Sequence, residues 1–142
     1  MANTVQLQLT VVSQEKQLLS VPVDSLTVDT AAGQVTILPG HIPLFSRINP
    51  GEIVYRTGHA EEALVVSRGF LDVGSNNQVV VMVDTGVLAK DINIEKTQAA
   101  IAAAHETMEK TQDQRELLLA EASLRQAMLE IRVAQKTKRT AI

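Results

Sequence analysis

The strongest constraint on this 142-residue chain is an abrupt change of composition near residue 87. All seven glycines, all four prolines and all three aromatic residues lie before that point. Residues 88–142 contain none of these and hold eleven alanines instead. Glycine and proline favour turns and aromatic residues favour strands, whereas alanine is the strongest helix former. We therefore expect two structural units with different secondary structure, covering residues 1–87 and 88–142.

The first unit has the pattern of an all-β domain. Val5, Leu7, Leu9 and Val11 alternate with polar residues, which is the period of a half-buried strand. Turn-forming residues separate further short apolar runs, which cover 21–23, 26–28, 35–38, 53–55, 63–66, 70–73 and 79–83. This rhythm predicts a β-sandwich of about 8–10 short strands. Residues 79–83 are apolar at every position, so we expect that strand to be buried on both faces near the centre.

The second unit has helical periodicity, and we expect an antiparallel two-helix hairpin. A nearly continuous helix is the alternative, because the break at residues 110–112 contains neither Gly nor Pro. Ile94, Ile101 and Met108 are seven residues apart, and a second stripe runs from Leu117 through Leu124, Met128 and Ile131. Asn93 is the expected N-cap of the first helix, and Thr111 and Asp113 begin capping patterns for the second. His105 lies between Ile101 and Met108, which predicts a partly buried packing role. The alanine-rich stripe buries little area, so we expect the hairpin to open easily.

No constellation of residues in the chain points to catalysis or to a bound cofactor. His41, His59 and His105 have no metal-ligand spacing, and there is no phosphate-binding loop, GxGxxG or GxSxG motif. The carboxylates of Glu61 and Glu62 adjoin a glycine turn, where a solvated charged turn is the expected role. We expect neither catalytic nor metal-binding residues, and no cofactor. A small hydrolase that depends on His41 or Glu62 is the disfavoured alternative.

Composition excludes several other classes. The net charge of −3 argues against a nucleic-acid partner, and the absence of cysteine excludes disulfides and thiolate chemistry. No apolar run approaches 18 residues, so we expect no membrane-spanning segment. The first four residues lack the pattern of a signal peptide, which makes a cytosolic location the default expectation.

The most specific motif is Gly33-x-x-x-Ile37-Leu38-Pro39-Gly40-His41-x-Pro43-Leu44. It resembles the signature of the epsilon subunit of F-type ATP synthases, which is called delta in mitochondria. Other segments agree in order, namely Val11-Val12-Ser13, Asn49-Pro50-Gly51-Glu52-Ile53, Ser67-Arg68-Gly69-Phe70-Leu71-Asp72-Val73 and Val83-Asp84-Thr85. The resemblance covers nearly the whole chain, and the sandwich followed by two helices is also that family's architecture. At residue 68 the family's glycine is replaced by arginine.

The resemblance implies a non-catalytic rotor subunit. Its sandwich would lie between the gamma subunit and the ring of c subunits, coupling proton flow to ATP synthesis. Gly33, Gln34, His41 and Pro43 match positions that face the ring. Many bacterial members carry an acidic residue where this chain has Gln34. We therefore expect Gln34 to form a hydrogen bond with the ring in place of an ionic contact. The protein would lie peripherally on the cytoplasmic face of a bacterial plasma membrane, with a thylakoid membrane as the alternative.

The resemblance also implies a regulatory role for residues 88–142. In the family, the extended helices reach the catalytic alpha and beta subunits and inhibit ATP hydrolysis. A basic stripe of Arg125, Arg132, Lys136 and Arg139, together with Lys138, would meet acidic segments of that head. The alternative is that these charges only stabilise the end of a helix.

Some members of the family bind ATP through an Ile/Leu-Asp-x-x-Arg-Ala motif. The matching positions here are Ile92, Asn93 and Lys96, followed by Thr97. Both charged groups of the motif are altered, because an amide replaces the carboxylate and an ammonium replaces the planar guanidinium. We expect weak or absent nucleotide sensing. The competing hypothesis for the whole chain is an adaptor subunit of another assembly with the same architecture.

Overall fold

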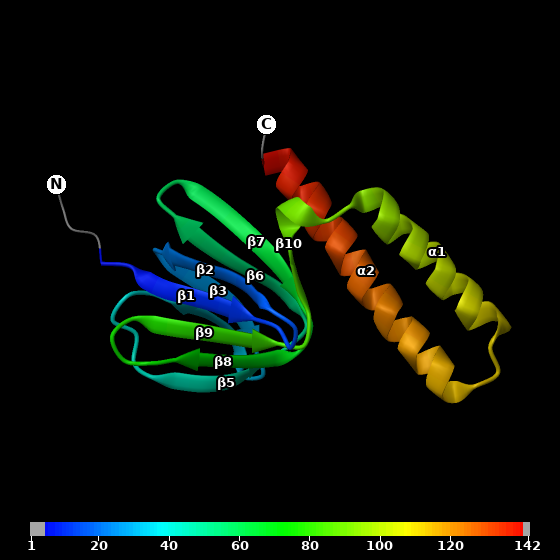
Figure 1. The fold of residues 1–142 in the computed structure, drawn as a ribbon, viewed down its shortest axis with the longest axis horizontal. Coiled ribbons are helices and arrows are strands. Elements are labelled where there is room, and N and C mark those ends of the chain that lie inside the picture. Colours follow the sequence, from blue (N-terminus) through cyan, green and yellow to red (C-terminus); the bar gives the residue numbers. More distant parts are fainter. Residues whose placement is uncertain (1–4, 141–142) are drawn as a thin grey trace. The chain divides into compact units, whose positions relative to one another are not determined.

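Strands occupy the first part of the chain and helices the second (Figure 1). The computed structural model describes residues 5–140, and side chains as far as Thr137. Its elements are β1 (Leu7–Val12), β2 (Gln17–Val23), β3 (Ser25–Thr30), β4 (Gly33–Ile37), β5 (Leu44–Ile48), β6 (Gly51–Thr57), β7 (Ala60–Val66), β8 (Gly69–Val73), β9 (Gln78–Val83), β10 (Gly86–Leu88), a short 3-10 helix η1 (Ala89–Asp91), α1 (Ile94–Lys110) and α2 (Gln114–Thr140). The chain forms two compact units, Met1–Val87 and Leu88–Ile142.

The strands form one continuous sheet that folds over on itself into a sandwich (Figure 1). The strand order is β10-β7-β6-β3-β5-β8-β9-β1-β2, and β4 pairs only with β3. β1 and β9 pair in parallel, whereas β1 with β2 and β6 with β7 are antiparallel hairpins. Alternate residues point inward, so that Leu7, Leu9 and Val11 of β1 and Ile53 and Tyr55 of β6 are all buried. The predicted sandwich is confirmed.

Two strands differ from expectation. β5 was not predicted, and it forms because it pairs with β8 along its whole length. β9 lies inside the sheet, between β8 and β1, as expected. The prediction that β9 is buried on both faces is wrong, because Val80 and Met82 are partly exposed while Val79, Val81 and Val83 are buried. The outer face of this part of the sandwich is therefore apolar and partly exposed.

The helical unit forms the predicted hairpin. The Asn93 side chain caps α1 by accepting a hydrogen bond from the Lys96 backbone N–H at 3.1 Å. Asp113 caps α2 in the same way, and its Oδ1 accepts the Arg115 N–H at 2.9 Å. Ala104, Ala120 and Ala127 are buried along the two helices, so that small side chains make much of the packing.

The expected packing role of His105 is wrong, because the side chain is exposed. The buried residues of α1 are Thr97 and Ala104. His105 follows Ala104 directly, and one residue turns a helix by about 100°. That rotation carries the imidazole away from the buried stripe.

Candidate functional site

The loop between β4 and β5 contains two of the residues expected to face a partner, His41 and Pro43. Gly40 adopts φ +85°, a conformation that favours glycine, and its N–H donates to the Asn77 side chain at 2.6 Å. The backbone N–H of His41 donates to the Leu38 carbonyl at 3.0 Å. The loop is thereby tied to the turn between β8 and β9. It holds Ile42 75% exposed, which is unusual for so large an apolar side chain.

The hairpin of β3 and β4 contains the other two residues expected to face a partner, Gly33 and Gln34. The Thr30 hydroxyl donates to the Gly33 carbonyl at 2.7 Å, and Gly33 has φ +113°. Gln34 is exposed, and its cross-strand partner is the exposed carboxylate of Asp29. Directly opposed side chains share a face of the sheet. An acidic group therefore lies beside Gln34, although residue 34 itself is an amide.

These four predicted residues do not form one cluster. Gly33 and Gln34 begin β4, whereas His41 and Pro43 lie beyond its other end. A strand of five residues spans about 13 Å between its first and last Cα atoms. Among the described strands β4 pairs with β3 alone, so the four residues lie at two ends of one edge strand.

An exposed aromatic pair lies on the outer face of β5 and β8. The rings of Phe45 and Phe70 stack with centroids 5.6 Å apart and planes inclined by 20°. They are 64% and 44% exposed. Phe70 pairs in register with Arg47 on β5 and with Met82 on β9. Met82 in turn pairs with Val12 on β1. We call Val12, Phe45, Phe70 and Met82 the outer apolar patch.

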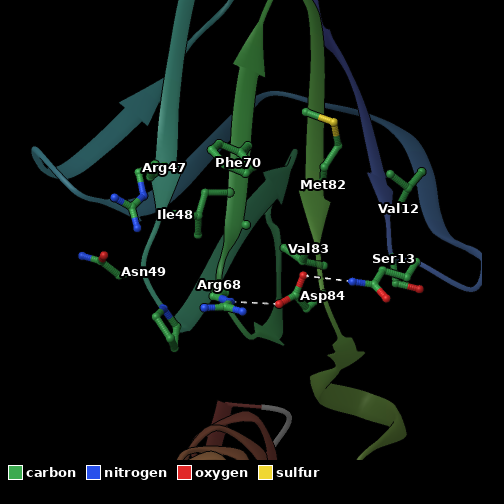
Figure 2. A pocket seen from close by; sticks show the side chains of 13 residues that line it. Val12, Ser13, Arg47, Ile48, Asn49, Arg68, Phe70, Met82, Val83 and Asp84 are labelled. Atoms are coloured by element: carbon green, nitrogen blue, oxygen red, sulfur yellow. Dashed lines mark hydrogen bonds and ion pairs between the residues drawn. The ribbon is translucent and has the colours of Figure 1, made fainter.

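An open groove of about 680 Å³ overlaps the outer apolar patch, because Val12, Phe70 and Met82 belong to both (Figure 2). Ile48, Phe70 and Met82 contribute its apolar lining, and Arg47 and Arg68 contribute cationic groups. We call it the Arg47–Arg68 groove. Sequence reasoning missed both the patch and the groove. The available signal was the sequence Phe70-Leu71-Asp72-Val73, whose alternation places Phe70 on the face opposite to Leu71.

Figure 2 shows the Arg68 guanidinium beside the Asp84 carboxylate. Arg68 Nε lies 3.0 Å from Asp84 Oδ2, and Gln14 Nε2 donates to Asp84 Oδ1 at 3.3 Å. Asp84 therefore has a partner on each oxygen. These contacts tie the turn after β1 to the ends of β8 and β9.

Other titratable groups have structural partners. The Asp24 carboxylate accepts hydrogen bonds from the Gly58 N–H at 2.5 Å and the Gln6 amide at 3.1 Å, and these hold its pKa below the ordinary value. Burial, together with a hydrogen bond of 2.6 Å to the Glu62 carboxylate, raises the pKa of Tyr55 well above its ordinary range. Glu61 pairs with Arg56 at 3.1 Å. The carboxylates of Glu61 and Glu62 on β7 thus contact side chains of the neighbouring strand β6.

The residues at the nucleotide-motif positions serve helix geometry. Ile92 ends η1, Asn93 caps α1, and Lys96 is exposed on the first turn. The Asn93 side-chain oxygen is already used by the Lys96 backbone N–H. An additional ligand would have to compete with this cap.

The predicted basic stripe lies on α2. Arg125 and Arg132 are exposed and seven residues apart, so they share one helix face. Lys136 is exposed one turn further along the same face and takes part in an interaction of its own. The side chains of Lys138 and Arg139 lie outside the described residues.

The described part of the chain contains no group of three His, Asp or Glu side chains arranged to hold a metal ion. Among its helices, none has the length and apolar character needed to cross a membrane.

Comparison with known proteins agrees with this architecture. Residues 6–89 match the family described as the ATP synthase delta/epsilon chain, beta-sandwich domain. The ATP synthase epsilon chain of Bordetella petrii is 33% identical over 135 residues, which cover 94% of this chain and 95% of that protein. The ATP synthase epsilon chain of Geotalea uraniireducens is 30% identical over 134 residues, covering 94% and 96%.

Solved structures share the fold. A chain in the cryo-EM structure of the Euglena gracilis mitochondrial ATP synthase superposes with a TM-score of 0.63 at 22% identity, covering 97% of this chain and 82% of that one. A chain in the central stalk and c-ring structure from Tetrahymena thermophila gives 0.54 at 14% identity, covering 92% and 95%. With both the domain and nearly full-length relatives in agreement, this chain belongs to the family of ATP synthase epsilon chains.

Proposed function

We propose that this chain is a non-catalytic rotor subunit of a proton-translocating F-type ATP synthase. In this proposal residues 1–87 link the gamma subunit to the ring of c subunits and couple ring rotation to ATP synthesis. Residues 88–142 regulate ATP hydrolysis. The protein lies peripherally on the cytoplasmic face of a bacterial plasma membrane. Family membership supports the assembly, and the outer apolar patch is the observation that carries the linking role.

The outer apolar patch suits a permanent partner, which we assign as gamma. Phe45 and Phe70 expose a stacked aromatic surface that water solvates poorly. Covering the exposed parts of both rings removes on the order of 200 Å² from water, about 5 kcal/mol at 25 cal/mol per Å². Aromatic side chains, Phe among them, are enriched in the buried cores of protein interfaces.

The edge formed by β4 and the following loop suits the ring. Gln34 and Asp29 present an amide and a carboxylate side by side, and His41 and Pro43 lie beyond the other end of the strand. Polar groups of this kind form contacts that contribute little individually. In this proposal the ionic contribution comes from Asp29, because residue 34 carries no charge.

The helical unit has features that suit a switch. Alanine side chains make much of the packing between α1 and α2, so opening exposes little apolar surface. Arg125 and Arg132 present positive charge along one exposed face of α2. We propose that this face docks on acidic segments of the alpha and beta subunits when the helices extend. To shift the ratio of extended to compact helices from 1:99 to 99:1, the alpha and beta subunits must bind the extended state more favourably than the compact one by about 5.5 kcal/mol.

The linking role is tested by the double variant Phe45→Ser/Phe70→Ser. We expect at least 30-fold weaker binding to a gamma-containing head complex by surface plasmon resonance, since the loss of one interface hot spot, about 2 kcal/mol, corresponds to about that factor. Val5→Ser is the matched control, because Val5 is equally exposed but is not part of the patch. Equal affinity of the double variant and the control would refute the proposed docking face.

The regulatory role is tested by truncation after Asp91, which removes α1 and α2. We expect the assembled complex to hydrolyse ATP faster with the truncated chain than with the full one. Unchanged hydrolysis would show that these helices are not inhibitory in this enzyme. Arg125→Glu/Arg132→Glu in the full chain should raise hydrolysis in the same direction if the basic face makes the inhibitory contact.

A further inference from the structure

The Arg47–Arg68 groove concentrates positive charge on an acidic domain. Residues 1–87 carry four basic and eight acidic side chains, yet two of the four basic ones line this groove. Of the other two, Arg56 pairs with Glu61 on the β6–β7 hairpin, and Lys16 lies in the turn after β1. A surface that opposes the net charge of its own domain favours an anionic partner.

The two arginines have different surroundings. Arg68 is held by Asp84, and its side chain remains 82% exposed. Arg47 is exposed and makes no ion pair with any of the residues whose side chains are described. Asp84, the acidic residue of the groove, is already paired with Arg68 and Gln14. The guanidinium of Arg47 therefore has all its donors available for a group from outside the chain.

The apolar lining restricts what that group can be attached to. Phe70 and Met82 flank the cationic groups, and both also belong to the outer apolar patch. A small, fully hydrated anion would gain nothing from these side chains. A carboxylate on a segment with apolar neighbours would satisfy Arg47 and cover the lining in the same contact.

We propose that the Arg47–Arg68 groove receives an acidic side chain, Asp or Glu, from an otherwise apolar segment of the gamma subunit. This inference rests on the proposed function, in which gamma covers the outer apolar patch. Arg47 binds the carboxylate through its planar fork, and the Arg68–Asp84 pair forms the fixed polar wall beside it.

The test compares Arg47→Glu with Arg56→Glu in the full chain. Both variants change the net charge equally, so they alter long-range attraction alike, and unchanged circular dichroism verifies that each is folded. We expect Arg47→Glu to weaken binding to the gamma-containing head complex at least tenfold more than Arg56→Glu. Arg47→Lys should lie between wild type and Arg47→Glu, because it retains the charge but loses the fork.

The outcomes separate the two proposals. If Phe45→Ser/Phe70→Ser weakens binding while Arg47→Glu and Arg56→Glu behave alike, the acidic contact is refuted and the docking face stands. If wild type does not bind the complex, both are refuted. Tight binding of inorganic phosphate to the isolated chain, abolished by Arg47→Glu, would also overturn the proposal, since it would identify a small-anion site.

Discussion

Replacing Gly69 with alanine should destabilise the sandwich strongly. A Cβ atom added at Gly69 would lie 2.0 Å from the Met82 carbonyl oxygen, 2.8 Å from Val83 Cα and 2.9 Å from the Met82 carbonyl carbon. All three atoms belong to the backbone of β9, which pairs with β8 at this position. No side-chain rotation can relieve the clash, so the two strands must separate locally.

The expected cost is at the upper end of the range for overpacking, about 3 kcal/mol. Gly69 also separates Arg68 from Phe70, so its substitution displaces the groove and the outer apolar patch together. Tyr55 is the only tyrosine, and the chain has no tryptophan. Because Tyr55 is buried in the sandwich, its fluorescence during urea unfolding follows that unit alone. With a slope of about 1 kcal/mol per M, the midpoint should fall by roughly 3 M.

Gly74→Ala is the matched control. A Cβ atom there would meet its nearest neighbour, the Gln78 carbonyl oxygen, at 3.5 Å, which is ordinary contact. We expect its midpoint to stay within about 0.5 M of wild type. Similar midpoints for Gly69→Ala and Gly74→Ala would refute the argument that backbone approach requires glycine at residue 69.

Three further predictions concern other parts of the molecule. Asp24→Asn should lower stability at pH 7. The folded-state pKa of Asp24 is below its ordinary 3.8, so the stability advantage of wild type is present above pH 3.8 and is lost as the pH falls through the depressed pKa. The urea midpoints of the two proteins should therefore converge in acid, and a constant difference down to pH 2 would contradict this. Asn93→Ala removes the cap of α1 and should destabilise the helices by about 1 kcal/mol. Thermal unfolding followed by far-ultraviolet circular dichroism measures this loss. Asn93→Asp should lose much less stability, and equal losses would exclude capping as the cause. The isolated chain should show no sub-micromolar ATP binding by calorimetry, and such an affinity would overturn the expectation. The double variant Asn93→Asp/Lys96→Arg restores the carboxylate and guanidinium of the family motif, and it should bind ATP more tightly than wild type.

Local features of the chain predicted most of its secondary structure, although they missed β5. Alternating side chains in residues 5–11 indicated a half-buried strand, and β1 has that burial pattern. Asn93 and Asp113 marked helix starts because a cap acts on backbone groups only two or three residues away. Signals of this range survive in the sequence, since the interacting groups are neighbours along the chain.

The interaction surfaces needed the tertiary structure. Arg47, Phe70 and Met82 come from three strands, and only the pairing of β5 with β8 and of β8 with β9 aligns them. The sequence could not distinguish an apolar strand buried on both faces from one whose second face is partly exposed, and β9 is of the second kind. The resemblance named Gly33, Gln34, His41 and Pro43 without a spatial arrangement, and the fold places them at two ends of β4.

The compositional break near residue 87 thus determined the architecture by itself, because glycine, proline and aromatic content decide backbone preference residue by residue. Which apolar side chains lie outward, and which charges meet beside them, depended on strand register. Register is a property of residues distant in sequence, and a shift of one residue would exchange the two faces of a strand. The outer apolar patch and the Arg47–Arg68 groove therefore emerged only when the sheet was assembled.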